Sequence, residues 1–255
     1  LRRTDLKDSD LSEADLNIAD LTGANLVGAK LAGANLDRIK LNQAKLNGAQ
    51  LSGARMTKAK LMQVDLTGAD LSGANLTGAE LNEALLEGAD LSRANLTEAI
   101  LINTNLKNTF LIGANLQKAN LEGANLESAD LAGTKLRFAT LQNANLKKID
   151  LRRSDLEHAD FSKAKLNSAN FTGAKMDGAD FTAATLTRTI LGSSGENTTD
   201  ATGRVFVKAN LSEAVLAPCE HGERLLGIAA RAPAAENLDA SHQIEPTLSV
   251  GLNQF

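Results

Sequence analysis

The side chains that could perform chemistry are few in this chain, and the densest group of them lies towards the C-terminal end. The single cysteine, Cys219, is followed by Glu220 and His221, and Glu223 comes two residues later. A Cys–His pair can act as a nucleophile when a third group orients the histidine within a pocket. We favour a structural role for this cluster instead, because it falls in a segment that we expect to cap the fold.

His158 is the second candidate for a chemical role. Glu157 and Asp160 lie beside it in the sequence, and two carboxylates next to one imidazole can recruit a metal ion. Acidic residues occur along the whole chain, however, so we interpret His158 as part of a solvated face. The sequence contains no P-loop, no GxGxxG and no GxSxG motif,. We therefore expect no catalytic residue, no metal site, no cofactor and no enzyme activity.

The composition argues against several classes of function. The 255 residues include 27 basic and 31 acidic ones, a net charge of −4, so we expect no strong attraction to nucleic acid or to an anionic membrane,. The absence of Trp and Tyr leaves only seven Phe rings on which bases or sugars could stack,. No stretch of about 18 apolar residues is present, so we expect no membrane insertion.

A five-residue repeat organises the chain. Residues 66–80 read Leu-Thr-Gly-Ala-Asp, Leu-Ser-Gly-Ala-Asn and Leu-Thr-Gly-Ala-Glu. We call the Leu position i; Ala then lies at i−2 and Asp or Asn at i−1 of the following unit. From Leu1 to Leu191 every fifth residue is Leu, Met or Phe without a break. A repeat with so fixed a period indicates a solenoid.

A period of five fits neither an α-helix nor a flat strand. Five residues advance about 500° around a helix, so the Leu side chains would form no stripe. On a strand the odd spacing would send alternate Leu side chains to opposite faces. The chain must therefore turn once per unit. Gly at i+2 suits the positive φ at the third residue of a type II turn, and Asp or Asn at i−1 can bond local backbone groups.

The pattern Ala-(Asp/Asn)-Leu-x-x resembles the pentapeptide-repeat family. The resemblance covers Thr4 to Leu191 and returns at 209–216. It implies an all-β fold, a right-handed quadrilateral β-helix or solenoid of about ten square coils with four units in each coil. In that fold i and i−2 point inward, and residues twenty apart stack in columns. The structural core is then expected to include Leu66, Ala69, Leu71, Ala74, Leu76, Phe161, Phe171 and Phe181.

The repeat also sets the expected domain boundaries. We expect a β-helix over 1–191, a loop insertion over 192–205, a final repeat coil segment over 206–216, and a C-terminal cap and tail over 217–255. The loop is rich in turn-forming residues, and it is either a tolerated insertion or a partner contact that presents Glu196 and Asn197. Apolar residues at 225–229 are compatible with a short helix that caps the open end of the solenoid.

Outward-facing positions provide the remaining clues. Basic residues gather between Lys30 and Lys60 and acidic ones between Asp65 and Asp90. These bands form either cross-coil ion pairs, such as Lys60 with Glu80, or a polar partner site. Some outward positions hold apolar residues, and we take five of them as candidate partner contacts although they fall on different faces: Leu85, Ile100, Ile102, Phe110 and Ile112,.

The favoured function is a non-enzymatic scaffold for an unidentified protein partner, with an end-to-end homodimer as a further hypothesis. The resemblance supplies an alternative, because some pentapeptide-repeat proteins mimic duplex DNA, bind the topoisomerase gyrase and protect against quinolones. Such proteins favour Phe at i and Cys at i−2, where this chain uses Leu and Ala. Residues 1–191 carry 23 basic and 23 acidic residues, whereas a DNA mimic needs a strong acidic excess,.

The Leu-rich and Gly-containing units look most like those of cyanobacterial and other bacterial members of the family. We expect a cytoplasmic location for the protein. The periplasm or the thylakoid lumen is the alternative if a signal segment precedes Leu1.

Overall fold

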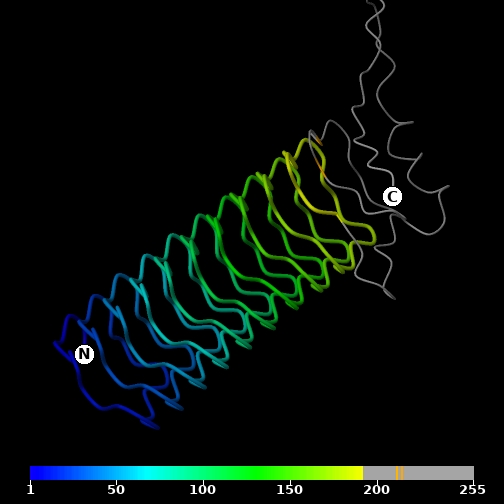
Figure 1. The fold of residues 1–255 in the computed structure, drawn as a ribbon. Helices are drawn as coiled ribbons and strands as arrows, with labels where there is room; N and C mark the ends of the chain where they lie inside the picture. Colours follow the sequence, from blue (N-terminus) through cyan, green and yellow to red (C-terminus); the bar gives the residue numbers. More distant parts are fainter. Residues whose placement is uncertain (192–210, 212–213, 215–255) are drawn as a thin grey trace, which may run out of the picture.

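The computed structural model describes residues 1–191 together with Leu211 and Ala214. Residues 1–191 wind into a rod of stacked four-cornered coils, with Leu1 at one end (Figure 1). The described residues contain no α-helix and no extended strand. Instead, each five-residue unit places one residue in an isolated parallel β-bridge and two residues in a turn.

Every bridge joins two residues that are twenty apart in the sequence. The ladder starts with Asp5 and Asn25 and continues to Asn170 and Ile190. Four units thus bring the chain back over itself, which is the geometry of a quadrilateral β-helix. The bridged residues form four outward rows, one on each side of the rod, and we name each face after the first residue of its row: the Asp5, Asp10, Asp15 and Asp20 faces.

Backbone hydrogen bonds explain why the unit has five residues. The N–H of Leu71, at position i, donates to the carbonyl of Asp90 on the next coil at 2.7 Å, and the N–H of Gly73 donates to that of Ser92 at 2.9 Å. The N–H of Ala74 closes the turn by donating to the carbonyl of Leu71 at 3.0 Å. The i−1 residue donates to the preceding coil in the same way, so only the N–H at i+1 lacks a backbone acceptor.

The turns are of type II throughout the rod. Their third residue has a positive φ in every unit from Arg3 to Arg188, whether it is glycine or not, and no positive φ occurs at i+1 among residues 1–191,. Gly68 adopts a φ of 65°, and the β-branched Ile18 adopts 61°. The ladder therefore imposes the left-handed conformation, and glycine is the residue that adopts it with least strain.

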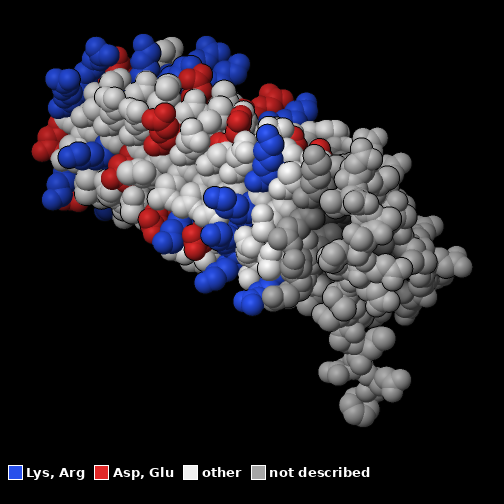
Figure 2. Space-filling model, turned by 90° about the horizontal axis from the view of Figure 1, so that it is seen from above, with Lys and Arg blue, Asp and Glu red and all other residues white. Residues whose placement is uncertain are grey.

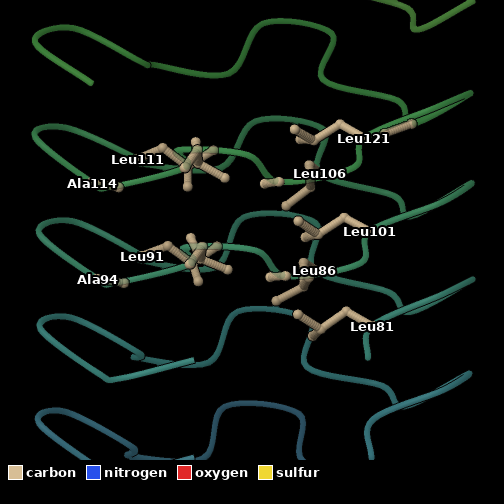
Figure 3. Close-up of a cluster of buried hydrophobic side chains, with 14 of the residues drawn as sticks. Leu81, Leu86, Leu91, Ala94, Leu101, Leu106, Leu111, Ala114 and Leu121 are labelled. Atoms are coloured by element: carbon tan, nitrogen blue, oxygen red, sulfur yellow. The ribbon is translucent and has the colours of Figure 1, made fainter. Parts of the chain in front are cut away.

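Inward-facing side chains fill the interior. Leu66, Leu71 and Leu76 are fully buried, as are the small residues Ala74 and Ala79 that alternate with them. Figure 3 shows the result in the middle of the rod, where leucines from successive coils stack in columns. The rod is stabilised by dispersion contacts within this close-packed axis and by the removal of its apolar surface from water.

Three phenylalanines pack together in the core near residue 170. The rings of Phe161 and Phe181 stack with their centroids 5.0 Å apart and their planes 2° from parallel. Phe171 meets both rings edge-on, at 6.3 Å from Phe161 and 5.9 Å from Phe181. All three side chains are fully buried. The twenty-residue register places the first two in one column, and these arrangements are favourable for aromatic quadrupoles.

Beyond residue 191 the structure describes only two positions. Leu211 packs against the core, and the N–H of Ala214 donates to the carbonyl of Leu211 at 3.0 Å, as in the turns of the rod. The predicted loop over 192–205 and the predicted cap and tail over 217–255 lie outside the described residues, so these boundaries remain predictions. Within the described part, no helix is long and apolar enough to span a membrane.

Candidate functional site

The Asp or Asn at i−1 satisfies the backbone N–H that the ladder leaves unpaired. A carboxylate oxygen of Asp90 accepts the N–H of Ser92, two residues later, at 2.8 Å, and the side chain of Asn75 does the same for Thr77 at 3.1 Å. The hydroxyl of Thr77 donates to the same oxygen at 2.7 Å. The commonest outward residues are thus explained by turn geometry. They carry little information about function.

Bridge positions that hold an apolar residue are more informative. Leu85, Ile100 and Phe110 each occupy an i−1 position. At this position an Asp or Asn side chain would accept the N–H of the residue two places later. After Phe110, for example, the N–H of Ile112 has no protein acceptor among the described residues. An apolar residue at these positions makes no hydrogen bond to the turn and presents apolar surface to water. The fold does not require an apolar residue there.

The structure distributes the candidate contacts over three faces. Leu85 lies on the Asp5 face, Ile100 lies on the Asp20 face with Ile102 at its corner, and Phe110 lies on the Asp10 face with Ile112 at its corner. The Asp10 and Asp20 faces are on opposite sides of the coil. Phe110 is 50% exposed and Ile112 is 45% exposed, and they form the most exposed neighbouring pair of the five. No single patch unites them. Two further candidates, Glu196 and Asn197, lie outside the described residues.

Sequence reasoning missed a second aromatic residue on the surface, Phe138. Its ring stacks on the imidazole of His158, with centroids 5.1 Å apart and planes 9° from parallel. Arg137 lies with its guanidinium carbon 6.0 Å from the Phe138 centroid and pairs with Glu157 at 2.7 Å. A Cβ at Gly178 would clash with His158 Nδ1, so the imidazole covers that glycine. The twenty-residue spacing of Phe138 and His158 was the signal that could have revealed the stack.

His158 therefore packs against an aromatic ring and a glycine. Among the residues that the structure describes, no group of three or more His, Cys, Asp or Glu side chains could hold a metal ion. The cluster at Cys219, Glu220, His221 and Glu223 lies outside those residues, and its structural interpretation remains a prediction.

Charged side chains of both signs are present on the surface of the rod (Figure 2). Lys60 pairs with Glu80 across the coils, in the register that the sequence predicts, and Arg55 pairs with Asp37 at 2.6 Å. Figure 2 shows acidic and basic side chains interspersed on the visible face of the rod. Lys45 and Asp65 are partners in a backbone β-bridge, but their side chains form no ion pair within 4.0 Å. Exposed pairs of this kind stabilise a fold only slightly.

Several of the turn carboxyl groups have a perturbed pKa. Hydrogen bonds from the Thr22 hydroxyl and backbone hold the pKa of Asp20 below its ordinary value of 3.8. Burial raises the pKa of Asp65, but hydrogen bonds from Thr67 and Asn47 outweigh the burial and lower it overall. The hydrogen-bonded turn thus favours the charged form of the carboxyl group.

Comparisons with known proteins agree with this architecture. A family model described as pentapeptide repeats matches eight copies over residues 1–38, 34–73, 74–111, 109–147, 134–173 and 164–192. Curated protein sequences give no significant match.

Several solved structures are similar to this chain. HetL, a pentapeptide repeat protein involved in heterocyst differentiation regulation from the cyanobacterium Nostoc sp. strain PCC 7120, is 29% identical over 84% of this chain and 90% of its own, with a TM-score of 0.49. A pentapeptide repeat protein from the Arabidopsis thaliana thylakoid lumen is 29% identical over 51% of this chain and 70% of its own, with a TM-score of 0.20. QnrB1, a plasmid-mediated fluoroquinolone resistance protein, is 19% identical over 80% of this chain and 95% of its own, with a TM-score of 0.36.

The family match spans nearly all of the described rod. It accounts for the five-residue unit, the type II turns and the parallel bridges at a spacing of twenty. The protein therefore belongs to the pentapeptide-repeat family, whose members fold as right-handed quadrilateral β-helices.

Proposed function

We propose that the protein is a non-enzymatic scaffold that binds a protein partner through side chains on the outer faces of its rod. The observation that carries this proposal is the filled interior: from Leu21 to Leu186 the inward positions hold buried apolar or hydroxyl side chains. Within residues 21–186, recognition chemistry is thereby confined to the outward positions. The hydrogen-bonded ladder holds these rows at a fixed spacing, which lowers the entropy lost when a partner binds them.

Some finer features of the scaffold are also proposals. At twenty residues per coil, residues 1–191 would make about nine and a half coils, and a helix within 217–232 would cap the last of them. A cytoplasmic location and an end-to-end homodimer remain hypotheses. The homodimer would be tested by sedimentation of the purified chain over a range of concentrations.

Cross-linking in the cells that produce the protein, followed by mass spectrometry and reconstitution from purified components, tests the scaffold proposal. We expect a complex of defined stoichiometry whose cross-links fall on outward positions. A chain that forms no such complex would contradict the proposal. A variant lacking 192–205 serves as a second arm, because unchanged recovery of the partner would exclude Glu196 and Asn197 as the contact.

The alternative is a DNA mimic that inhibits or protects gyrase. The equal numbers of acidic and basic residues in 1–191 argue against it, since a duplex mimic needs a continuous acidic surface,. A supercoiling assay with purified gyrase separates the two functions. We expect neither inhibition nor quinolone protection at micromolar protein, and either effect would favour the alternative.

A further inference from the structure

The Asp10 face has an unusual bridge row in the middle of the rod. Successive coils contribute Asp70, Asp90, Phe110, Asp130 and Asp150 to this row. A phenylalanine therefore stands at the centre of a ladder of carboxylates. Adjacent like charges in such a ladder repel one another, so the row is electrostatically unfavourable while it faces water alone.

Three of these carboxylates form no ion pair within 4.0 Å among residues 1–191, and one of them, Asp130, also feels the charge of Arg152. Asp70, Asp90 and Asp130 form no ion pair within the described residues, whereas Asp150 pairs with Arg152 at 2.6 Å. Each of the three uses one oxygen to accept the N–H two residues later, at 2.8 to 3.0 Å. The second oxygen of each makes no hydrogen bond inside the described part of the chain and is available to a cation.

The surface on one side of the ring is low and open. Gly68 and Gly88 form one corner of the face, and a Cβ at either would meet no atom within 4 Å. The opposite corner holds Ser72 and Ser92, and the side chain of Arg93 extends from there to Gly113. Phe110 therefore projects from its surroundings, together with Ile112. Phe110 has no aromatic neighbour among the described residues, in contrast to Phe138.

Phe110 also works against local stability. The flanking Asp90 and Asp130 each satisfy a turn N–H, and Phe110 cannot do this for Ile112. Phe110 lacks the turn hydrogen bond that its neighbours in the row make and stays half exposed, and a contact outside the chain would account for its presence here,.

We propose that the Phe110 patch, which comprises Asp70, Asp90, Phe110, Ile112 and Asp130, docks a basic protein surface. An apolar pocket on the partner receives the Phe110 ring, and Lys or Arg side chains around that pocket meet the three carboxylates. Arginine suits both parts, because its guanidinium pairs with carboxylates and stacks on aromatic rings. An aromatic anchor surrounded by complementary charge is the usual anatomy of a binding hot spot.

This proposal rests on the scaffold function and names the chemistry of its partner. The negative charge of the Phe110 patch disfavours nucleic acid and anionic membrane as occupants.

Two asparagine substitutions test the patch in the full-length chain. Phe110→Asn restores a side-chain acceptor for the N–H of Ile112 and removes the anchor. Ile100→Asn makes the same type of change in the same coil on the opposite face. We expect both variants to unfold at a higher urea concentration than the parent, and only Phe110→Asn to lose binding.

The probe is a twelve-residue peptide of alternating arginine and leucine, mapped on the ¹⁵N-labelled protein by amide chemical shifts. We expect perturbations around Gly88, Ser92 and Ile112, a Kd at least tenfold weaker in Phe110→Asn, and an unchanged Kd in Ile100→Asn. A peptide of alternating glutamate and leucine should not bind. Perturbations on another face, equal Kd values in the two variants, or no binding at millimolar peptide would each overturn the proposal.

The cross-linking experiment distinguishes failure of this proposal from failure of the scaffold function. A protein partner that cross-links to another face leaves the scaffold function standing and refutes the Phe110 patch. The absence of any partner, together with no peptide binding, refutes both.

Discussion

The backbone N–H of Ser92 donates to a carboxylate oxygen of Asp90, 2.8 Å away and two residues earlier in the chain. The carbonyl of the same Asp90 accepts the N–H of Leu71 from the preceding coil. One residue thus joins the turn to the ladder. This double role explains why Asp and Asn recur at the outward bridge position, and it allows the contribution of the side chain to be measured.

Removing the side-chain acceptor should destabilise the rod. Asp90→Ala leaves the N–H of Ser92 without its partner, and we expect a loss of about 1 kcal/mol in the free energy of unfolding. Asp90→Asn retains an oxygen at the same place and should lie close to the parent. Urea unfolding of the two variants checks this, and equal losses would show that charge matters here more than the hydrogen bond.

At the left-handed turn position, removing a glycine should lower the free energy of unfolding and introducing one should raise it. At Gly68 a new Cβ would have open space, so Gly68→Ala isolates the backbone strain and should destabilise by about 1 kcal/mol,. Ile18→Gly removes a β-branched residue from a φ of 61° and should stabilise the rod by a similar amount,. Thermal unfolding of both variants measures the pair. A stabilising Gly68→Ala would be incompatible with the turn geometry.

Stability should fall in acid because of the turn carboxyl groups. Asp20 and Asp65 have folded-state pKa values below the ordinary 3.8. Their stabilisation is therefore fully present above about pH 4 and is lost as the pH falls through the lowered folded-state pKa. Melting temperatures measured from pH 7 to pH 2 should show a plateau followed by a decline. In Asp65→Asn the decline should be smaller, and a decline of unchanged size would remove Asp65 from the explanation.

A polar substitution inside the rod should be severe. Leu76 is fully buried. We expect Leu76→Ala to cost about 3 kcal/mol, and Leu76→Asp to cost more, because its carboxylate would have neither water nor a partner. Leu76→Met conserves volume and should cost less than about 1.5 kcal/mol. Circular dichroism melts rank the three variants, and an unchanged melt for Leu76→Asp would refute the filled interior.

The five-residue period made much of the fold predictable. It determines which side chains face inward, so the burial of Leu66 and the stacking of Phe161 on Phe181 follow from spacing alone. The turn type followed from the glycines at i+2, although Ile18 shows that the ladder imposes the same φ on unfavourable residues. In each case a rule that repeats along the chain decides the structure.

The candidate site was less predictable because it depends on departures from that rule. The sequence shows Phe110 and Ile112 as outward apolar residues. Only the structure shows that Asp90 accepts a turn N–H and that Phe110 cannot do the same for Ile112. Phe138 was missed, since its partner His158 is far away in sequence unless the twenty-residue register is applied to outward positions. Residues 217–255 carry no repeat, so only composition and local propensity were available there.

The central claim is that residues twenty apart share one row, because the filled interior and the Phe110 patch both depend on it. The most direct measurement is disulfide formation in a Cys219→Ser background. Stacked residues about 4.8 Å apart suit a disulfide. Ser72→Cys with Ser92→Cys should therefore cross-link rapidly under native conditions, whereas Ser72→Cys with Thr97→Cys, one corner further along, should not. Efficient cross-linking of the second pair in place of the first would contradict the account.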